Sequence, residues 1–402
     1  MRRKGQRWAA VAMALVLAGA VTACGDDDED DAGDGGDATN TTAAEGQTEI
    51  GEGEGAVSIL AWPYYAEDGS QDPNYDWVTA YEEATGCQAT VTYFGTSDEA
   101  FTLFASGDYD VVSASGDSSM RSVASGDAAA INTELLTNYG DLAPFLKEQA
   151  WNSIDGTVYG VPHGWGANVL QYNTDVVTPA PTSWGAVFDP ESPYAGKIAA
   201  YDSPIYIADA AVYLMATEPD LGIENPYALD EEQFTAAVDL LKAQSDLLSE
   251  YWSDYVAYED NFRAGSTVMG TSWQIIANTL QADEPPTPVD SVLPEEGSTA
   301  WSDNWMVYSE ADHPNCAYEW LNYITSPEVQ ATVATTFGEA PANLAACDGI
   351  AEHCEQYHAD DAAYYDQLHY WTTPTKECLD GRTDVECKDY AEWVAAWTEV
   401  KG

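Results

Sequence analysis

The stretch that decides the fold is residues 57–117, in which three apolar segments alternate with two helical ones. VSILAW at 57–62, ATVTY at 89–93 and YDVV at 109–112 have the β-branched and aromatic content of strands. The segments between them carry apolar residues at helical spacing, and each ends near a glycine. This strand, helix, strand, helix, strand order predicts a parallel sheet and an α/β fold.

A similar pattern recurs in the second half of the chain. Asp230 and Gln233 predict a capping box at the start of a helix. FRAGSTVMG at 262–270 then resembles FASGDYDVV at 104–112, because in both a helix end and a glycine lead into a strand. VPHGWGANVLQYN at 161–173 predicts one long strand that crosses between the two units. We therefore expect two α/β lobes whose strand ends face a shared cleft, where open sheets bind ligands.

The N-terminal residues have the pattern of an exported lipoprotein. Basic residues within 2–7 precede an apolar run at 8–21, which is too short for an ordinary membrane span. VTAC at 21–24 has the form of a lipobox. We expect a signal peptide over 1–23 and a lipid on Cys24, with a plain secretory signal as the alternative.

The chain is strongly acidic. It holds 69 Asp and Glu against 13 Lys and Arg, which gives a formal net charge of −56 at pH 7. Nucleic acid is therefore excluded as a natural partner. Residues 24–55 are so acidic and so poor in apolar side chains that they predict a disordered tether, and they lack the spacing of a calcium loop. Two interpretations of the overall charge stay open, adaptation to a salty medium and attraction of cations into a cleft.

Cysteine usage also indicates export. Apart from Cys24 the chain has six cysteines, and an even number in an oxidising compartment predicts disulfides. Six cysteines allow fifteen pairings. Sequence proximity favours the first two of the following pairs, and the third is what they leave: Cys347–Cys354, Cys378–Cys387 and Cys87–Cys316.

Motifs of enzymes and metal sites are missing from the sequence. It has no Gly-x-Ser-x-Gly elbow, no His-Glu-x-x-His and no phosphate-binding glycine loop. His163 is a candidate base, but no nucleophile or partner acid accompanies it. His353, Cys354 and His358 offer a metal site as a rival to the disulfides, although their spacing fits no strong ligand pattern. We expect no catalysis, no bound metal and no cofactor.

Several short motifs are similar, in order and spacing, to those of a known family. They are Trp62 after the first strand, YDVV at 109–112 before a serine, VPHGWG at 161–166, LPEEG at 293–297 before Trp301 and Asp303, and GEAPANLA at 338–345. From about Val57 to Ala346 the chain resembles the spermidine/putrescine-type substrate-binding proteins of ABC transporters. The resemblance implies a two-lobed periplasmic-binding-protein fold of type II, with the ligand cleft between the lobes.

The expected domain organisation follows from the motifs and the resemblance together. The segments are a signal peptide (1–23), a tether (24–55), the first lobe (56–163 and 296–338), and the second lobe (164–295 and 339–402, the latter with a disulfide-rich C-terminal part).

The resemblance, with the aromatic residues near the motifs, also implies a ligand pocket. The expected pocket residues are Trp62, Tyr64, Ser115, Asp117, Trp165, Asp202, Tyr206, Trp273, Trp301 and Asp303. The chain departs from the family pattern where Tyr64, Ser203 and Tyr206 stand at positions that are acidic in the family. It therefore has fewer carboxylates and more aromatic rings for its ligand.

The expected ligand is a small organic cation, most simply a polyamine. Carboxylates bind ammonium groups by charge-assisted hydrogen bonds, and aromatic faces attract them by cation–π interaction. A quaternary ammonium such as choline is the alternative, because it needs rings rather than hydrogen bonds. We expect a monomer that the lipid on Cys24 anchors to the outer face of the cell membrane, and the resemblance implies that it delivers its ligand to an ABC permease and ATPase. A ligand sensor is the competing role.

Overall fold

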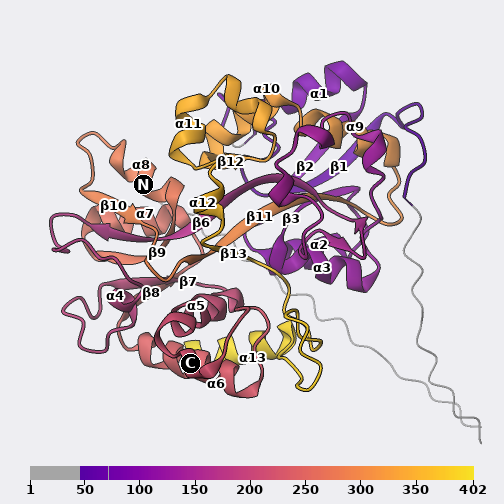
Figure 1. The fold of residues 1–402 in the computed structure, drawn as a ribbon. Coiled ribbons are helices and arrows are strands. Elements are labelled where there is room, and N and C mark those ends of the chain that lie inside the picture. Colours follow the sequence, from indigo (N-terminus) through magenta and orange to yellow (C-terminus); the bar gives the residue numbers. More distant parts are fainter. Residues whose placement is uncertain (1–45, 71) are drawn as a thin grey trace, which may run out of the picture. The chain divides into compact units, whose positions relative to one another are not determined.

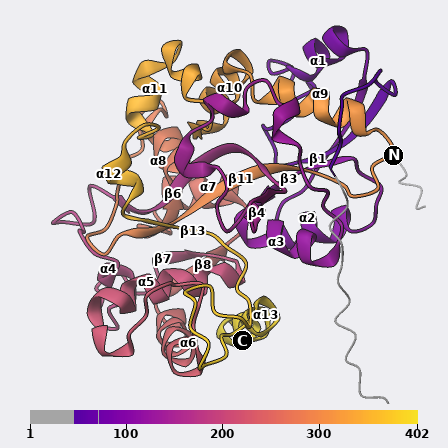
Figure 2. The same ribbon diagram turned by 45° about the vertical axis from the view of Figure 1, so that its right-hand side comes forward.

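The computed structural model describes residues 46–70 and 72–402. Cys24 and the expected signal peptide lie outside the described residues, as does most of the expected tether. In this part of the chain no helix has the length and hydropathy to cross a membrane. Figures 1 and 2 show the described residues from two directions.

The first lobe is built on the predicted parallel sheet. Strand β1 (Ala56–Ala61) lies between β2 (Gln88–Tyr93) and β3 (Val111–Ser115) and is parallel to both. The connections are α1 (Val78–Thr85) and α2 (Ser97–Phe104), so the strand and helix order read from the sequence is confirmed. Helix α1 ends at Gly86, which has a φ of 79° that favours glycine.

The second lobe repeats this arrangement with other strands. Its parallel strands are β7 (Ile198–Tyr201), β8 (Leu248–Trp252) and β9 (Met269–Trp273), with β7 in the middle. Its helices are α4 (Gly185–Phe188), α5 (Ile207–Thr217), α6 (Glu231–Ser245), α7 (Tyr255–Ala264) and α8 (Gln274–Gln281). The predicted capping box of Asp230 and Gln233 is present at α6.

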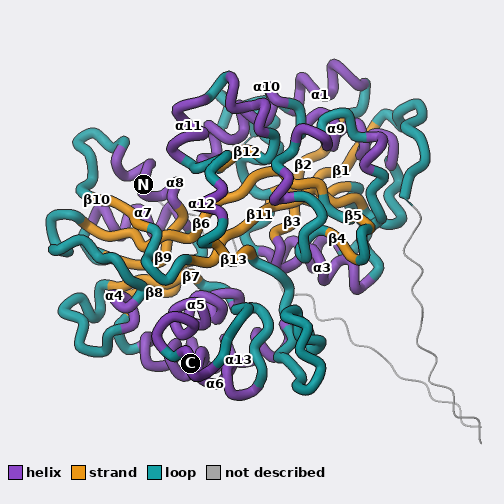
Figure 3. The backbone as a smooth tube through the Cα atoms, in the orientation of Figure 1, coloured by secondary structure: helices purple, strands orange, loops and turns teal. Residues whose placement is uncertain are grey.

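Two long antiparallel strands join the lobes. Strand β6 (Val161–Asn173) pairs with β11 (Ser298–Val307) over its first half and with β9 over its second half. Because β11 also pairs with β3, one continuous sheet runs in the order β2-β1-β3-β11-β6-β9-β7-β8. Figure 3 shows this band of strands with helices on both sides.

The remaining elements cover the ends and faces of this sheet. The strands are β4 (Ser153–Ile154), β5 (Thr157–Val158), β10 (Val289–Val292), β12 (Ala340–Pro341) and β13 (Leu368–Tyr370). The helices are α3 (Gly116–Ser125), α9 (Pro314–Ile324), α10 (Pro327–Val333), α11 (Ala351–Gln356), α12 (Ala362–Tyr365) and α13 (Tyr390–Lys401).

The buried apolar residues identify the two lobes and correct one expected boundary. The core of the first lobe contains Trp305 and Trp320, and that of the second contains Trp184 and Trp393. Ala340, Cys354 and Tyr370 pack in the first core, whereas Trp371, Trp393 and Trp397 pack in the second. The chain therefore stays with the first lobe up to Tyr370, and not only up to residue 338 as expected. The reason is that β12 and β13 pair with β6 and β11.

The six cysteines form the three expected disulfides, the two that sequence proximity favoured and the third that these two leave. They are Cys87–Cys316, Cys347–Cys354 and Cys378–Cys387. Cys87–Cys316 ties the residue after α1 to α9 within the first lobe. The rival metal site is wrong, because Cys354 has no thiolate to offer while it is bonded to Cys347.

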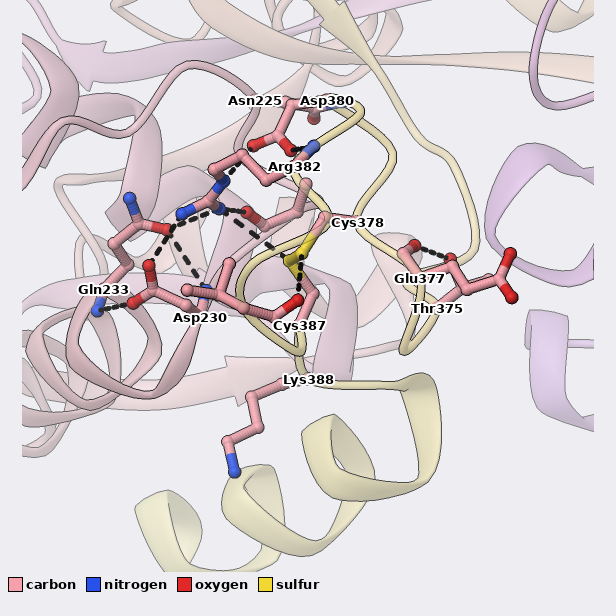
Figure 4. Close-up of a disulfide and its surroundings, with 12 residues drawn as sticks. Asn225, Asp230, Gln233, Thr375, Glu377, Cys378, Asp380, Arg382, Cys387 and Lys388 are labelled. Atoms are coloured by element: carbon pink, nitrogen blue, oxygen red, sulfur yellow. Dashed lines mark hydrogen bonds and ion pairs between the residues drawn. A yellow bond between two sulfur atoms is a disulfide. The ribbon is translucent and has the colours of Figure 1, made fainter.

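The segment between β13 and α13 is closed into a loop by Cys378–Cys387, and Arg382 joins this loop to the start of α6 (Figure 4). The guanidinium of Arg382 donates to Asp230 Oδ2 at 2.6 Å, to the Ala228 carbonyl at 2.6 Å and to Gln233 Oε1 at 3.0 Å. It also donates to Asp380 Oδ2 at 2.8 Å. One side chain thus joins this segment to the capping box of α6.

Candidate functional site

A cavity of about 320 Å³ lies between residues of the two lobes. The first lobe contributes Trp62, Pro63, Tyr64, Phe94, Gly95 and Ser115, and the second contributes Tyr201, Ser253, Asp254, Tyr255 and Trp273. Trp301, Asp303, Phe337 and Trp371 complete the lining. Four of these residues stand at the end of a parallel strand or directly after it, as expected for a ligand site in an α/β sheet: Trp62, Ser115, Tyr201 and Trp273.

Aromatic rings form most of the wall. The rings of Tyr201 and Trp371 are stacked, with centroids 5.8 Å apart and planes within 13°. Trp273 lies against Tyr201 at 5.5 Å, and Trp301 meets Phe337 edge-on at 5.9 Å. Because these rings support one another, the cavity offers fixed π faces to a ligand. Such faces attract an organic cation by about 1–2 kcal/mol each when water is excluded.

Two glycines let the aromatic wall form. Gly166 lies opposite Trp301 in the β6–β11 ladder, and a Cβ on it would stand 2.6 Å from the indole ring. Gly116 lies so close to the Trp371 carbonyl that a Cβ would overlap its oxygen at 1.9 Å. A larger residue would displace the Trp301 ring at position 166 and the backbone of Trp371 at position 116.

Asp303 supplies the buried carboxylate of the cavity. It sits on β11, where the pairing with β6 shifts register between Asp303 and Asn304, an irregularity that re-aims side chains. Its Oδ2 accepts a hydrogen bond of 2.7 Å from the Tyr65 hydroxyl. Burial raises the pKa of Asp303 to about 6, although contacts with Ser115 and Tyr65 lower it. The group is therefore an anion at neutral pH, in surroundings that favour a cationic partner.

A second carboxylate, Asp254, lines the cavity from the second lobe. It caps α7, where its Oδ1 accepts the backbone N–H groups of Val256 at 3.0 Å and Ala257 at 3.2 Å. Asp254 is exposed, whereas Asp303 is 4% exposed. The cavity thus has one carboxylate within the protein and one at its solvent side.

Two tyrosines meet across the cavity next to Asp254. Tyr64 of the first lobe has a φ of 70°, and its N–H donates to Glu67 Oε1 at 2.7 Å, which fixes this left-handed turn. Burial, and then contact with the Tyr64 hydroxyl, raises the pKa of Tyr255 in the second lobe. Tyr64 and Tyr255 thus line the cavity from opposite lobes.

Six of the ten residues expected in the pocket line this cavity. They are Trp62, Tyr64, Ser115, Trp273, Trp301 and Asp303. Asp117 lies nearby at the start of α3, 1% exposed and without a partner for either carboxylate oxygen among residues 46–70 and 72–402. Burial raises its pKa to about 7.

The other three expected pocket residues lie elsewhere, and these assignments are corrected. Trp165 is fully buried in the first core, between Phe145 and Tyr370. Asp202 points away from the cavity, because its carboxylate binds the Lys401 ammonium at 2.7 Å and accepts the Trp397 indole N–H at 3.0 Å.

Tyr206 is the third of these residues, and it is a core side chain. It lies in a short turn after β7, 1% exposed, where its hydroxyl contacts Gln244 and Thr271, each at 3.1 Å. Its hydrogen-bonding groups are thus used inside the second lobe and are not offered to a ligand.

Several cavity residues were not predicted from the sequence. Tyr201 adjoins the predicted Asp202, and the alternation of side chains along a strand would have identified it. Trp371 directly follows β13, so its signal was an aromatic after a strand, as for Trp62. For Asp254 and Tyr255 the sequence shows only the start of a helix, at which Asp254 is the cap. For Phe94 and Phe337 no sequence pattern indicates a place in the cavity.

Comparisons with known proteins agree with this architecture. A spermidine/putrescine-binding periplasmic protein of Escherichia coli is 25% identical over 304 residues, covering 73% of this chain and 83% of that protein. A putrescine-binding periplasmic protein of Pseudomonas aeruginosa is 24% identical over 343 residues, covering 81% and 88%.

A solved structure shows the same fold. The spermidine/putrescine ABC transporter substrate-binding protein of Streptococcus pneumoniae superposes with a TM-score of 0.65 at 18% identity, over 86% of this chain and 97% of that one. The family model for bacterial extracellular solute-binding proteins matches residues 76–364. The chain, with its two α/β lobes and a cavity between them, therefore belongs to the bacterial extracellular solute-binding protein family, a family of substrate-binding proteins and not of enzymes.

Proposed function

We propose that this protein binds a small organic cation of the polyamine class and delivers it to an ABC importer. The observation that carries the proposal is Asp303, a buried carboxylate at the base of a cavity walled by aromatic rings. A buried charge is stable only when it is paired, and an ammonium group satisfies both the carboxylate and the rings. The relatives named for putrescine and spermidine support this class of ligand.

The number of carboxylates favours a short diamine over a longer polyamine. Only Asp303 and Asp254 are acidic among the residues that line the cavity. Each buried ammonium of a ligand needs its own partner, so two carboxylates suit two ammonium groups. In this arrangement the inner ammonium binds Asp303, the methylene chain packs between the rings, and the outer ammonium lies near Asp254.

Calorimetry with putrescine, spermidine and choline tests the proposal. We expect putrescine to bind the wild type. Asp303→Asn should cost more affinity than Trp62→Phe, because loss of one partner of a buried charge pair costs about 3–5 kcal/mol and loss of part of one cation–π contact about 1 kcal/mol. The control Asp220→Asn removes an exposed carboxylate that does not line the cavity, so it should leave the affinity for putrescine unchanged.

Other outcomes of the same titrations contradict the proposal in distinct ways. If choline binds and Trp62→Phe is the more damaging change, the site takes a quaternary ammonium held by rings alone. If no cation binds, or if only a sugar or an anion does, the polyamine assignment is wrong. In that case the acidic composition has no part in ligand capture.

We further propose that Cys24 carries lipid and anchors the protein to the outer face of the membrane. The support is the basic, apolar and VTAC pattern of residues 2–24. Mass spectrometry of membrane-extracted protein should find an N-terminal, lipid-modified Cys24, and Cys24→Ala should release the protein into the medium. A Cys24→Ala variant that stays in the membrane fraction would contradict the anchor.

The role in import, as opposed to sensing, rests on the family and on the relatives. Reconstituted permease and ATPase from the same genome should show ligand-stimulated ATP hydrolysis only when this protein is added. Binding of the same ligand without any stimulation would favour a sensor.

A further inference from the structure

A chain of buried polar groups runs from Asp303 into the first lobe. The Tyr65 hydroxyl lies 2.7 Å from Asp303 Oδ2 and 3.0 Å from Glu339 Oε2. His163 Nε2 faces Glu339 Oε1 at 3.5 Å, and His163 Nδ1 lies 3.2 Å from the amide nitrogen of Gln330. All five side chains are at most 4% exposed. None of them except Asp303 lines the cavity.

The far end of this chain fixes the tautomer of His163. The Gln330 amide nitrogen donates to the Ile324 carbonyl at 3.1 Å, and its oxygen accepts the Asn343 N–H at 3.2 Å. These backbone groups set which end of the amide faces the histidine. Because the amide nitrogen is a donor, His163 Nδ1 must accept, and the imidazole carries its proton on Nε2. His163 stays neutral, since burial lowers its pKa to about 3.

The near end of the chain requires a proton on one of the two carboxyl groups. A phenol has one proton to donate, yet the Tyr65 hydroxyl contacts both carboxyl groups. One carboxyl group must therefore donate to Tyr65. Among the described residues neither group has a Lys or Arg beside it, but Asp303 lines the cavity and Glu339 does not, so ionisation is less favourable at Glu339.

The packing around Glu339 provides space for this group and for nothing larger. Gly164 lies across the β12–β6 pairing, and a Cβ on it would stand 2.2 Å from the Glu339 carboxyl. The backbone carbonyl of Glu339 contacts His353 Nε2 at 2.7 Å. The titratable groups around the carboxyl are thus Tyr65, His163 and Asp303, with Tyr357 and His353 beyond them.

We propose that Glu339 is a positioning residue for Asp303 and acts as a neutral carboxylic acid. His163 Nε2–H faces Glu339 Oε1, Glu339 Oε2–H donates to the Tyr65 oxygen, and Tyr65 donates its proton to Asp303 Oδ2. The hydrogen bonds from Glu339 to Tyr65 and from Tyr65 to Asp303 then both point toward Asp303, while His163 Nε2 lies 3.5 Å from Glu339 Oε1 without a hydrogen bond. This direction keeps Asp303 ionised and holds its plane, and it limits the pair of buried carboxyl groups to one negative charge. The inference rests on the proposed function only where it concerns ligand affinity.

The direction of the chain predicts which substitutions are tolerated. Glu339→Gln keeps a donor toward Tyr65 and an acceptor toward His163, so putrescine affinity should stay within about threefold of the wild type. Glu339→Met removes the donor at similar size, and Tyr65→Phe removes the donor to Asp303. Both should weaken putrescine binding by about tenfold or more, Tyr65→Phe because it removes a hydrogen bond to a charged group and Glu339→Met because it frees the Tyr65 hydroxyl that makes this bond. Equal losses in Glu339→Gln and Glu339→Met would overturn the proposal.

A measurement without ligand separates this inference from the proposed function. The infrared difference spectrum between wild type and Glu339→Gln at pH 7.5 should show the C=O band of a protonated carboxylic acid in the wild type. The spectrum of the Asp303→Asn variant itself, recorded at the same pH, should still contain that band. If the difference shows a carboxylate band instead, Glu339 is ionised and the proposal is wrong. If the acid band is present and putrescine does not bind the wild type, the ligand class fails and the hydrogen-bond chain stands.

Discussion

At the scale of single residues, the cavity depends on which side of a strand each residue faces. Trp301 reaches the ligand space because its cross-strand neighbour is Gly166, and the indole lies over the position where a side chain would be. A glycine at such a place in a long strand has a clear physical purpose. The same argument applies to Gly116 against the Trp371 carbonyl.

Gly166→Ala should therefore damage both binding and stability. Its Cβ would stand 2.6 Å from the Trp301 ring, so the ring must move, and over-packing of this kind costs about 1–3 kcal/mol. Thermal unfolding and putrescine titration should show a lower melting temperature and a weaker affinity. Gly140→Ala is the control, because a Cβ there meets nothing within 4 Å. Equal behaviour of the two variants would contradict the role of Gly166.

Six of the fifteen residues that line this cavity were predicted from the sequence, for reasons that individual residues make clear. Trp62 and Asp303 were predicted because motifs place them directly after or within strands of the sheet. Asp202 was predicted to line the cavity, but its neighbour Tyr201 does so instead. A motif locates the end of a strand but not the direction of each side chain. Phe337 reaches the cavity from after α10, a placement that only tertiary packing decides.

At the scale of elements, the predicted strands and helices of both lobes were found because their periodic patterns are long. The parallel strands, the capping box of α6 and the crossing strand β6 all follow from local sequence. The return of the chain after residue 338 was misplaced, because β12 and β13 are two and three residues long. Such short strands have no period to read, and their partners β6 and β11 are distant in sequence.

The segment between β13 and α13 carries one wall residue of the cavity, and Arg382 fixes this segment to the second lobe. Trp371 begins this segment and lines the cavity, and the far part of the segment is joined to α6 by Arg382 within the loop that Cys378–Cys387 closes (Figure 4). Arg382 does not line the cavity itself, but it holds the same segment that carries Trp371.

Arg382→Met should loosen this segment and weaken binding without touching the cavity. The substitution removes the four hydrogen bonds that the guanidinium donates to Asp230, Ala228, Gln233 and Asp380. We therefore expect the free energy of unfolding to fall by about 1–3 kcal/mol. Hydrogen exchange should rise in residues 374–389.

Two further variants make this experiment specific. Arg382→Lys should not restore stability, because an ammonium cannot reproduce the planar fork. Lys376→Met is the matched control from the same segment, since its pair with Glu386 is exposed on both sides and exposed pairs contribute little to stability. If Lys376→Met loosens the segment as much as Arg382→Met does, the role of Arg382 is misassigned.

At the scale of the whole molecule, the distribution of acidic groups has two parts with different consequences. The chain has a net charge of −56, and most of the acidic side chains among residues 46–70 and 72–402 are in contact with water. A few carboxyl groups are instead buried without a cation. Burial raises the pKa of Asp117 to about 7 and that of Asp209 to about 8, and it raises the pKa of Glu339 well above its usual range.

These buried acids should make the protein more stable as the pH falls from 8 to about 6.5. In this window the folded chain holds protons that the unfolded chain has lost, so folding is favoured by lower pH. Each such group contributes about 1.4 kcal/mol per pH unit between its unfolded and folded pKa. Below about pH 6.5 the gain should flatten, because burial lowers the pKa of His163 to about 3 and the unfolded chain then binds the histidine proton.

Urea unfolding at pH 8 and pH 6.5 measures this slope, and salt separates its two sources. Repulsion between surface carboxylates also relaxes at lower pH, but 0.5 M salt screens it, whereas a buried acid is screened much less. Asp209→Asn keeps an acceptor for the Thr299 hydroxyl, which lies 2.9 Å from Asp209 Oδ1, and removes the buried acid. This variant should gain stability at pH 8 and lose part of the slope in high salt, whereas Asp220→Asn should do neither. A slope that vanishes in salt for the wild type would assign the whole effect to the surface, and Asp209 would then have no part in it.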